Sequence, residues 1–248
     1  MKIIIIIPAR FNSSRFPGKP LIKLLDKPMI QWVAELSSKA VGKENVYVAT
    51  ENNKIFNTIS KLGFKSIMTS KHCLTGTDRL AEVAQKVKAD IYVNVQGDEP
   101  LVSPRDIKKI IKAKKKYPNE VINGFTIIKK HEDVNSVNIP KVVFTKDKRL
   151  VYISRQSLPG FKDKKNQPNH YFKQVCIYAF NRNELLSYGK LKNKGFIEKA
   201  EDIEIIRFFE LKKTIRMVET SPDTLAVDEP RDIKKVEIAL KKLIKKIN

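Results

Sequence analysis

The chain has 248 residues, a length that suits a single α/β domain, and 42% of them are hydrophobic, enough to bury a full-sized core. Its two cysteines, Cys73 and Cys176, stand far apart in the sequence. Two lone cysteines indicate neither a disulfide framework nor a zinc site, and they favour a reducing, cytoplasmic compartment. The apolar run from Ile3 to Ile7 is too short for a signal peptide or a membrane span. We therefore expect a buried first strand and no membrane insertion.

The formal net charge of +22 has three interpretations. It can reflect a lysine-rich solvated surface, steering of anionic substrates, or a nucleic-acid interface. Lysine is spread along the whole chain, with runs at Lys112 to Lys116, Lys162 to Lys165 and Lys241 to Lys246. The sequence shows no basic motif interleaved with aromatic residues. We therefore favour the solvated surface and expect no nucleic-acid partner.

Short β-branched runs alternate with helical patterns along the first half of the chain. The predicted strands are Lys2–Ile7, Asn45–Ala49, Ser66–Met68, Ile91–Gln96, Val121–Ile128, Lys141–Phe144, Gln174–Phe180 and Arg216–Glu219. The predicted helices are Met29–Ser38, Asn53–Leu62, Thr77–Val87, Pro104–Tyr117, Ala200–Phe209 and Glu229–Lys246. This alternation predicts an α/β fold with a mostly parallel sheet between two helical layers. From about residue 120 to 190 the strands cluster, which predicts a smaller antiparallel extension within one domain covering residues 1–248.

The loop after the first strand carries three cations, Arg10, Arg15 and Lys19, among small and hydrogen-bonding residues. Gly18 would let the backbone approach a ligand closely. Arginine forks and a lysine ammonium suit the oxygens of a triphosphate. The loop matches neither the Walker A nor the dinucleotide-binding pattern. Phosphate binding and an ordinary polar turn both remain open from the residues alone.

A second unusual loop follows the predicted strand Ile91–Gln96. The sequence there is Asn-Val-Gln-Gly-Asp-Glu-Pro, from Asn94 to Pro100. Ligands of open parallel sheets collect beyond the carboxyl ends of strands, and Asp98 stands at such an end beside a space-clearing glycine. Magnesium takes one or two carboxylates together with phosphates and waters. Asp98 therefore suits a Mg²⁺ site, although a solvated turn explains the residues equally well.

The two loops together resemble the 3-deoxy-manno-octulosonate cytidylyltransferases, through P-A-R-x-x-S-S-R-x-P-G-K-P-L and N-V-Q-G-D-E-P. The resemblance implies a three-layer, Rossmann-like fold of the nucleotide-diphospho-sugar transferase type. It further implies that the first loop holds the CTP phosphates and that Arg15, Lys19 and Asp98 are catalytic. The nucleotide-binding residues implied in the two loops are Pro8, Ala9, Arg10, Arg15, Lys19 and Gln96.

Two further segments fit this resemblance. The run from Thr75 to Glu82 resembles the family segment that lines the base and ribose pocket, which implies nucleotide contacts from Thr75, Gly76 and Arg79. Helix capping by the threonines and pairing of Arg79 with neighbouring residues are the alternatives. Asp228 matches the family's second magnesium-binding aspartate, and its alternative role is a helix cap before Pro230.

The resemblance also implies a sugar pocket. The implied sugar-binding residues are Arg155, Gln174, Tyr178, Glu204 and Ile205. Arg155 can grip a carboxylate with two hydrogen bonds. Glu198, Glu201 and Glu204 are predicted to lie broadly on one helical face, and an ordinary solvated face is the alternative. The resemblance implies that Glu204 contacts the sugar hydroxyls.

Three positions in this region depart from the family. Gln174 stands where the family has His, Cys176 where it has Gly, and Ile205 where it has Gln. In the family these segments face the sugar, so the departures leave open a modified sugar such as an amino-substituted octulosonate.

We expect a cytoplasmic enzyme that transfers CMP from CTP to a 3-deoxy-manno-octulosonate-type sugar acid, for lipopolysaccharide sugar activation. The resemblance implies Mg²⁺ as cofactor, with Asp98 and Asp228 as ligands, and a homodimer formed through the antiparallel region. Two alternatives are a nucleotidyltransferase with another sugar acid or nucleotide, and a non-catalytic, basic α/β protein that binds nucleic acid.

Overall fold

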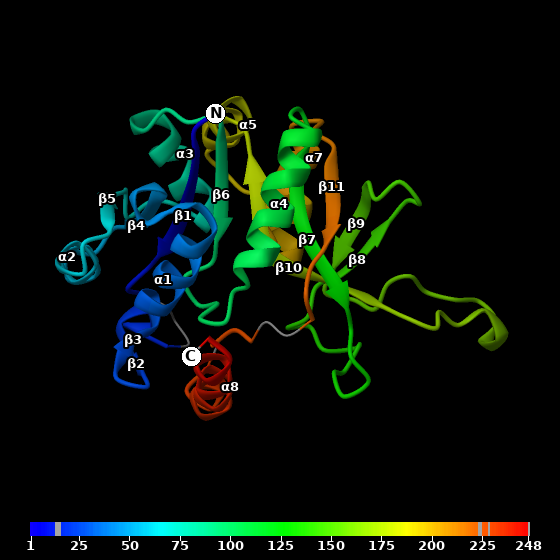
Figure 1. The fold of residues 1–248 in the computed structure, drawn as a ribbon. Coiled ribbons are helices and arrows are strands. Elements are labelled where there is room, and N and C mark those ends of the chain that lie inside the picture. Colours follow the sequence, from blue (N-terminus) through cyan, green and yellow to red (C-terminus); the bar gives the residue numbers. More distant parts are fainter. Residues whose placement is uncertain (13–15, 223–224, 228, 248) are drawn as a thin grey trace.

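The structure is a computed structural model that describes residues 1–12, 16–222, 225–227 and 229–247. A central twisted sheet lies between two layers of helices, and a short two-stranded ribbon and the last helix lie beyond one edge (Figure 1). The main strands are β1 (Ile3–Ala9), β4 (Val46–Thr50), β5 (Lys65–Met68), β6 (Ile91–Val95), β7 (Val121–Ile127), β8 (Lys141–Phe144), β9 (Leu150–Ser154), β10 (Phe172–Phe180) and β11 (Ile215–Glu219). The ribbon strands are β2 (Lys23–Leu24) and β3 (Lys27–Pro28).

The described helices vary widely in length, and the longest is the last. The α-helices are α1 (Met29–Val41), α2 (Asn53–Lys61), α3 (Gly76–Lys86), α4 (Pro104–Lys116), α5 (Arg182–Lys190), α6 (Phe196–Glu201), α7 (Arg207–Glu210) and α8 (Asp232–Ile247). The 3-10 turns are η1 (Lys19–Leu21), η2 (Lys43–Asn45), η3 (Lys164–Asn166) and η4 (Glu204–Ile206). Among the described residues, no helix is long and apolar enough to cross a lipid bilayer.

The strand order in the sheet is β11-β7-β10-β6-β1-β4-β5. Neighbours on the β1 side run parallel, whereas β10 runs antiparallel to both β6 and β7. The predicted mostly parallel α/β sheet is therefore confirmed. The antiparallel part consists of β10 within the sheet and the β8–β9 hairpin attached to it. The segment between β9 and β10 extends well away from the sheet (Figure 1).

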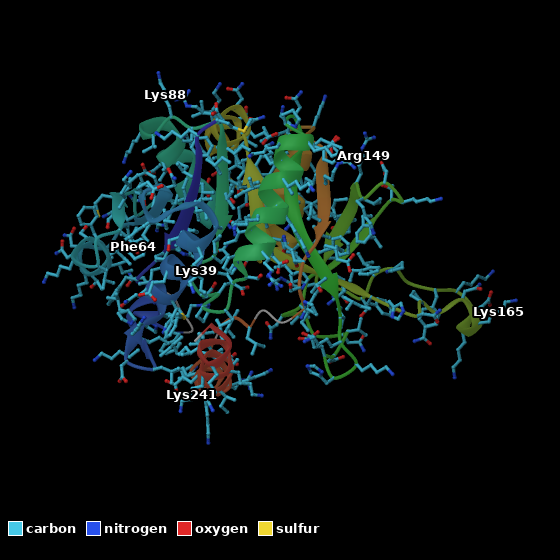
Figure 2. The ribbon with its side chains drawn as sticks, viewed as in Figure 1. Lys39, Phe64, Lys88, Arg149, Lys165 and Lys241 are labelled. Atoms are coloured by element: carbon cyan, nitrogen blue, oxygen red, sulfur yellow. The ribbon has the colours of Figure 1, made fainter. Side chains whose placement is uncertain are left out.

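Both faces of the sheet are covered, which explains the uninterrupted isoleucine run of β1. Ile4 and Ile6 pack with α3 and α5 residues on one face, while Ile5 and Ile7 pack with α1 and α4 residues on the other. A separate cluster joins α8 to α1 and the β2–β3 ribbon. The described lysines of the three runs are exposed apart from the buried Lys114, and Figure 2 shows Lys165 and Lys241 directed into solvent.

One predicted helix is wrong. The segment predicted as a helix from Ala200 to Phe209 breaks at Asp202, which adopts a left-handed backbone conformation with φ of 48°. Such a conformation ends a regular helix, so α6, η4 and α7 follow one another as separate turns. The glutamates of this segment therefore do not share one helical face.

Strand β9 and helix α5 are among the elements missed from the sequence. Strand β9 contains the run Leu-Val-Tyr-Ile-Ser and pairs with β8. Helix α5 begins at a capping box in which Asn181 and Glu184 exchange side chain to backbone hydrogen bonds. Asparagine followed three residues later by glutamate is a signal from which the start of α5 could have been predicted.

The pair Lys114–Glu184 gives a prediction about stability. Both side chains are 1% exposed, and the Lys114 ammonium lies 2.7 and 2.8 Å from the two oxygens of Glu184. Replacing Glu184 by Gln leaves the buried ammonium without a charged partner, so the free energy of unfolding should fall by about 3 kcal/mol. Urea unfolding of both proteins at pH 7 measures this difference. An unchanged midpoint and slope would contradict the proposed importance of the pair.

Candidate functional site

The loops that leave β1 and β6 meet at the carboxyl edge of the sheet, because these strands are parallel neighbours. An added Cβ atom on Gly97 would lie 2.8 Å from the carbonyl oxygen of Pro8. This distance is below van der Waals contact, so a side chain at position 97 would push the two loops apart. Glycine therefore allows the acidic loop after β6 to lie directly against the end of β1.

The cationic loop closes on itself before reaching the acidic loop. Gly18, at φ of 71°, donates its backbone N–H to the Phe11 carbonyl over 2.8 Å. Turn η1 follows at once, and the Nζ of Lys19 lies 2.6 Å from Oδ2 of Asp98. The structure thus brings Lys19 and Asp98 together, although 79 positions separate them in the sequence. Arg15 lies outside the described residues.

Two adjoining chambers open at this edge. The first has a volume of about 160 Å³ and is lined by Pro8, Ala9, Arg10, Lys19, Gly76, Gln96 and Asp98. The second has a volume of about 320 Å³, and its lining includes Arg10, Thr75, Gly76, Gln96, Arg155, Gln174, Cys176, Tyr178 and Glu204. Arg10, Gly76 and Gln96 line both chambers. The chambers therefore communicate through these three residues.

Glu204 lines the second chamber and bonds to Gln96, which lines both chambers. Its carboxylate accepts hydrogen bonds from the backbone N–H of Thr77 at 2.8 Å and from Nε2 of Gln96 at 3.0 Å. Burial raises the pKa of Glu204 above its ordinary value near 4.5, and the hydrogen bonds from Thr77 oppose this shift. Because Nε2 of Gln96 is engaged with Glu204, the amide of Gln96 is held in one orientation at the junction of the chambers.

An irregularity in β10 shapes the second chamber. The pairing of β10 with β7 shifts between Val175 and Tyr178, and the side chain of Asn123 donates to the Val175 carbonyl at 2.9 Å. Gln174 donates from its amide to Asn123 at 3.0 Å and to the Tyr178 hydroxyl at 3.3 Å. The bulge satisfies its backbone through Asn123 and leaves Gln174, Cys176 and Tyr178 facing the chamber.

The two ionisable groups of the bulge stay protonated at neutral pH. Burial raises the pKa of the Cys176 thiol to about 12 and raises the pKa of Tyr178 well above its usual value. A thiol of this kind is a poor nucleophile. Cys176 therefore contributes shape and weak polarity to the chamber rather than reactivity.

Arg155 lies at the far side of the second chamber. Its guanidinium donates to the backbone carbonyls of Glu201 at 2.6 Å, Val137 at 2.7 Å and Asp202 at 3.1 Å. These bonds use three of its five N–H groups and hold its plane in place. Lys194 pairs with Asp202 at 2.5 Å on the same rim, and its hydrogen bond lowers the pKa of Asp202. The rim thus carries two cations and one carboxylate.

Two predicted site residues do not reach either chamber. Arg79 is 1% exposed, and its guanidinium pairs with Glu51 at 2.6 Å and donates to the Thr69 hydroxyl at 2.7 Å. Ile205 is fully buried in the core behind the second chamber, because the chain turns at η4 and presents Ile203 to the chamber instead. Pairing of Arg79 with neighbouring residues is therefore confirmed, and direct ligand contacts from Arg79 and Ile205 find no support in the geometry.

The remaining acidic residues of the broken helix serve different neighbours. Glu198 pairs with the buried Arg207 at 2.6 Å, and Arg207 also pairs with Asp78 at 2.7 Å. Glu201 accepts hydrogen bonds from the Ser154 hydroxyl at 2.6 Å and from the Arg155 backbone at 2.8 Å. Only Glu204 of the three glutamates lines a chamber. Glu198 and Glu201 instead hold neighbouring segments together through these contacts.

Some lining residues were missed from the sequence. These are Asn138, Pro140, Lys194, Asp202 and Ile203. Lys194 is one lysine among many in a basic chain, and Asp202 was assigned to a helix interior. Their position depends on how distant segments pack, so no local pattern identifies them. Thr75, by contrast, forms the capping box of α3 with Asp78, as the alternative interpretation predicted, and also lines the second chamber.

The acidic loop contains two described carboxylates, Asp98 and Glu99, of which Asp98 lines the first chamber. Asp98 is 31% exposed, and its backbone carbonyl accepts from the Val227 N–H at 3.0 Å. Among the residues that the structure describes, no group of three or more His, Cys, Asp or Glu side chains is arranged around a metal position. Asp228, the other predicted ligand, lies outside the described residues. Within the described part of the chain, Asp98 is thus the carboxylate that lines the first chamber.

Comparison with known proteins first gives the class. The family model described as "Cytidylyltransferase" matches residues 4–215. A solved cytidylyltransferase from Leptospira borgpetersenii shares the fold, with a TM-score of 0.62 at 18% identity over 99% of this chain and 94% of that one. A solved structure described as CMP:2-keto-3-deoxy-manno-octonic acid synthetase complexed with CTP matches more closely. Its TM-score is 0.89 at 36% identity, covering 98% of this chain and 99% of that one.

The names of curated relatives are more specific than the family model, because they include the sugar. The 3-deoxy-manno-octulosonate cytidylyltransferase of Geotalea uraniireducens is 39% identical over 98% of this chain and 100% of its own length. The 8-amino-3,8-dideoxy-manno-octulosonate cytidylyltransferase of Shewanella frigidimarina is 36% identical over 97% and 99%. The chain belongs to the 3-deoxy-manno-octulosonate cytidylyltransferase family.

The raised pKa of Glu204 predicts a pH dependence of stability. An acid whose pKa is higher in the folded state binds more protons when folded, so its ionisation destabilises the fold. As pH rises from about 4.5 through the folded pKa, the native protein should lose stability relative to Glu204→Gln, and above that pKa the difference should stay constant. Urea unfolding of both proteins across this range measures it. Parallel curves would show that Glu204 titrates normally.

Proposed function

We propose that this enzyme transfers CMP from CTP to a 3-deoxy-manno-octulosonate-type sugar acid and releases pyrophosphate. The observation that carries the proposal is the pair of communicating chambers. One presents Arg10, Lys19 and Asp98, as phosphates and a cation require, and the other presents Arg155 and hydrogen-bonding side chains, as a sugar acid requires. The names of the curated relatives and of the CTP-complexed structure support the same substrates.

In this reaction the anomeric hydroxyl oxygen of the sugar bonds to the α-phosphorus of CTP, and the bond from that phosphorus to the bridging oxygen breaks. The hydroxyl proton passes to solvent and pyrophosphate leaves. Such a transfer depends mainly on positioning and on neutralising charge. In our assignment Lys19 and Arg15 stabilise the leaving pyrophosphate, and Arg10 neutralises charge where the two substrates meet. Gln96, whose amide is oriented by Glu204, lies between the two chambers and positions the nucleotide in one and the sugar in the other.

We propose Mg²⁺ as the cofactor. Asp98 fits a magnesium site of the kind that keeps one or two carboxylates and takes its other oxygens from phosphates and water. Asp228 is the second proposed ligand. Val227, the residue before it in the sequence, donates its backbone N–H to the Asp98 carbonyl. When bound, the ion supplies charge neutralisation at the phosphates and acidifies the attacking hydroxyl. Lys19, already at 2.6 Å from Asp98, holds the carboxylate in place.

For the sugar we propose contacts from Arg155, Gln174, Tyr178 and Glu204. Arg155 retains free N–H groups after its three bonds to backbone carbonyls, and these suit the sugar carboxylate. Glu204 and the Tyr178 hydroxyl suit sugar hydroxyls. For the nucleotide we propose contacts from Pro8, Ala9, Thr75 and Gly76.

The 8-amino sugar is a second candidate substrate. The chamber contains an exposed carboxylate, Asp202, and the family's usual His and Gly are replaced by Gln174 and Cys176. Relatives named for the 8-amino sugar match the chain at 35–36% identity over nearly its full length. An ionised carboxylate on the rim can accept a hydrogen bond from an ammonium group, which a hydroxyl replaces less favourably.

A substrate panel tests both proposals. We expect pyrophosphate release with CTP and one of the two octulosonates, and little release with ATP, GTP or UTP. Comparing kcat/KM for the plain and 8-amino sugars decides between the two candidates. A clear preference for the plain sugar would overturn the amino-sugar alternative, and no pyrophosphate release with either sugar would overturn the proposed function.

Replacing Asp98 by Asn tests the role of the acidic loop. The amide keeps the shape but removes the charge, so kcat should fall by about 100-fold or more while CTP still binds. Pyrophosphate release gives the rate, and calorimetric titration gives the CTP affinity. Asp163→Asn, which removes an exposed carboxylate in the extended loop, is the matched control and should keep wild-type rates. A wild-type rate in Asp98→Asn would refute the metal assignment.

We also propose a single cytoplasmic domain that forms a homodimer through residues 120–190. Among the described strands, β9 pairs with β8 alone, and it presents Val151 with 60% of its side chain exposed. An open strand edge with an apolar side chain suits pairing with a second copy. The free thiols and the use of CTP suit the cytoplasm. Light scattering of the purified chain measures its mass, and a monomer would exclude the dimer.

A further inference from the structure

We infer that Glu51 is a positioning residue for the nucleotide, acting by holding the first turn of the cationic loop. This inference rests on the proposed function and deepens it. Glu51 follows β4 directly, at the same carboxyl edge as the chambers, but it lines neither of them. Its side chain is 14% exposed and lies behind the cationic loop.

The carboxylate of Glu51 has one oxygen for each of two partners. Oε1 accepts the backbone N–H of Phe11 at 2.9 Å, and Oε2 lies 2.6 Å from Nη2 of Arg79. Phe11 is the residue directly after Arg10, so its backbone fixes where the Arg10 side chain begins. A hydrogen bond from a backbone N–H to a carboxylate is stronger than a neutral one and restricts the backbone that it holds.

The restraint continues through the loop. The Phe11 carbonyl accepts from Gly18, which closes the loop, and the next residue is Lys19, at 2.6 Å from Asp98. One carboxylate therefore anchors the loop at the residue where it closes, between its two described phosphate-facing cations. Without that anchor, the loop keeps its closure but loses its attachment to β4.

Arg79 makes Glu51 rigid from the other side. Its guanidinium is 1% exposed and donates to the Thr69 hydroxyl at 2.7 Å and to the Ser70 carbonyl at 3.1 Å, beyond the end of β5. Arg79 also belongs to α3, whose first turn forms the wall of both chambers. Arg79 therefore has a role without touching a ligand. It fixes the position of the Glu51 carboxylate, and Glu51 fixes the backbone of the cationic loop at Phe11.

Glu51→Gln is the decisive variant. The amide can accept from Phe11 or face Arg79, but its NH₂ group opposes the guanidinium, so the loop should lose its fixed position. We expect the Kd for CTP to rise about tenfold, while the KM for the sugar changes less than twofold. Glu51→Asp keeps the charge on Arg79 with a shorter reach, so it should fold well and raise the Kd for CTP by a smaller factor.

Glu184→Gln is the matched control, because it also removes the carboxylate of a buried ion pair, but between α4 and α5. It should lower stability without changing the Kd for CTP. Calorimetric titration with CTP alone tests the inference independently of the sugar. Equal CTP affinity in wild type and Glu51→Gln would overturn the inference while leaving the proposed function intact. A rise of similar size in Glu184→Gln would also overturn it, since any loss of stability would then have the same effect.

Discussion

The buried carboxylate of Glu204 is the constraint on which both chambers depend. It ties the first turn of α3, through the Thr77 backbone, to the end of β6, through Gln96. Gly76 makes this junction possible, since an added Cβ atom would lie 3.1 Å from Pro8 and 3.4 Å from a Glu204 oxygen. A buried carboxylate is unfavourable unless donors surround it, so separating these segments would remove the donors that Thr77 and Gln96 supply. These two hydrogen bonds therefore help to hold α3 and the end of β6 together beside the chambers.

The need to separate like charges also explains why the helix breaks at Asp202. A continuous helix would direct the glutamates at positions 198, 201 and 204 to one side, where they would repel one another. The left-handed turn at Asp202 instead sends Glu198 to Arg207, Glu201 to the β9 end and Glu204 to the chambers. The same turn releases the Asp202 carbonyl, which Arg155 binds. One unusual backbone conformation thus links the antiparallel hairpin to the chamber wall.

The sequence predicts the parts of this molecule that depend on local patterns. The isoleucine run of β1 and the alternation of strands and helices predicted the layers of the fold correctly. The family motifs, including the acidic loop with its glycine, identified residues that line the first chamber. The break at Asp202 was not predicted because the helical spacing of apolar residues continues through it. Arg79 and Ile205 were assigned to ligands because a motif gives the order of residues but not which of them the fold buries. Lys194 and Asp202 reach the second chamber only through tertiary packing.

The two chambers differ in how far their residues can change. The first is built from backbone contacts between parallel strands, with Gly18 and Gly97 at positions where a side chain would strain or separate the loops. The second is built from side chains on a β-bulge, a turn and a loop, which packing holds from several directions. Substitutions in the second chamber can therefore alter which groups of a sugar are recognised while the geometry around the nucleotide is kept. This division gives a physical reason why relatives named for two different octulosonates resemble this chain to nearly the same extent.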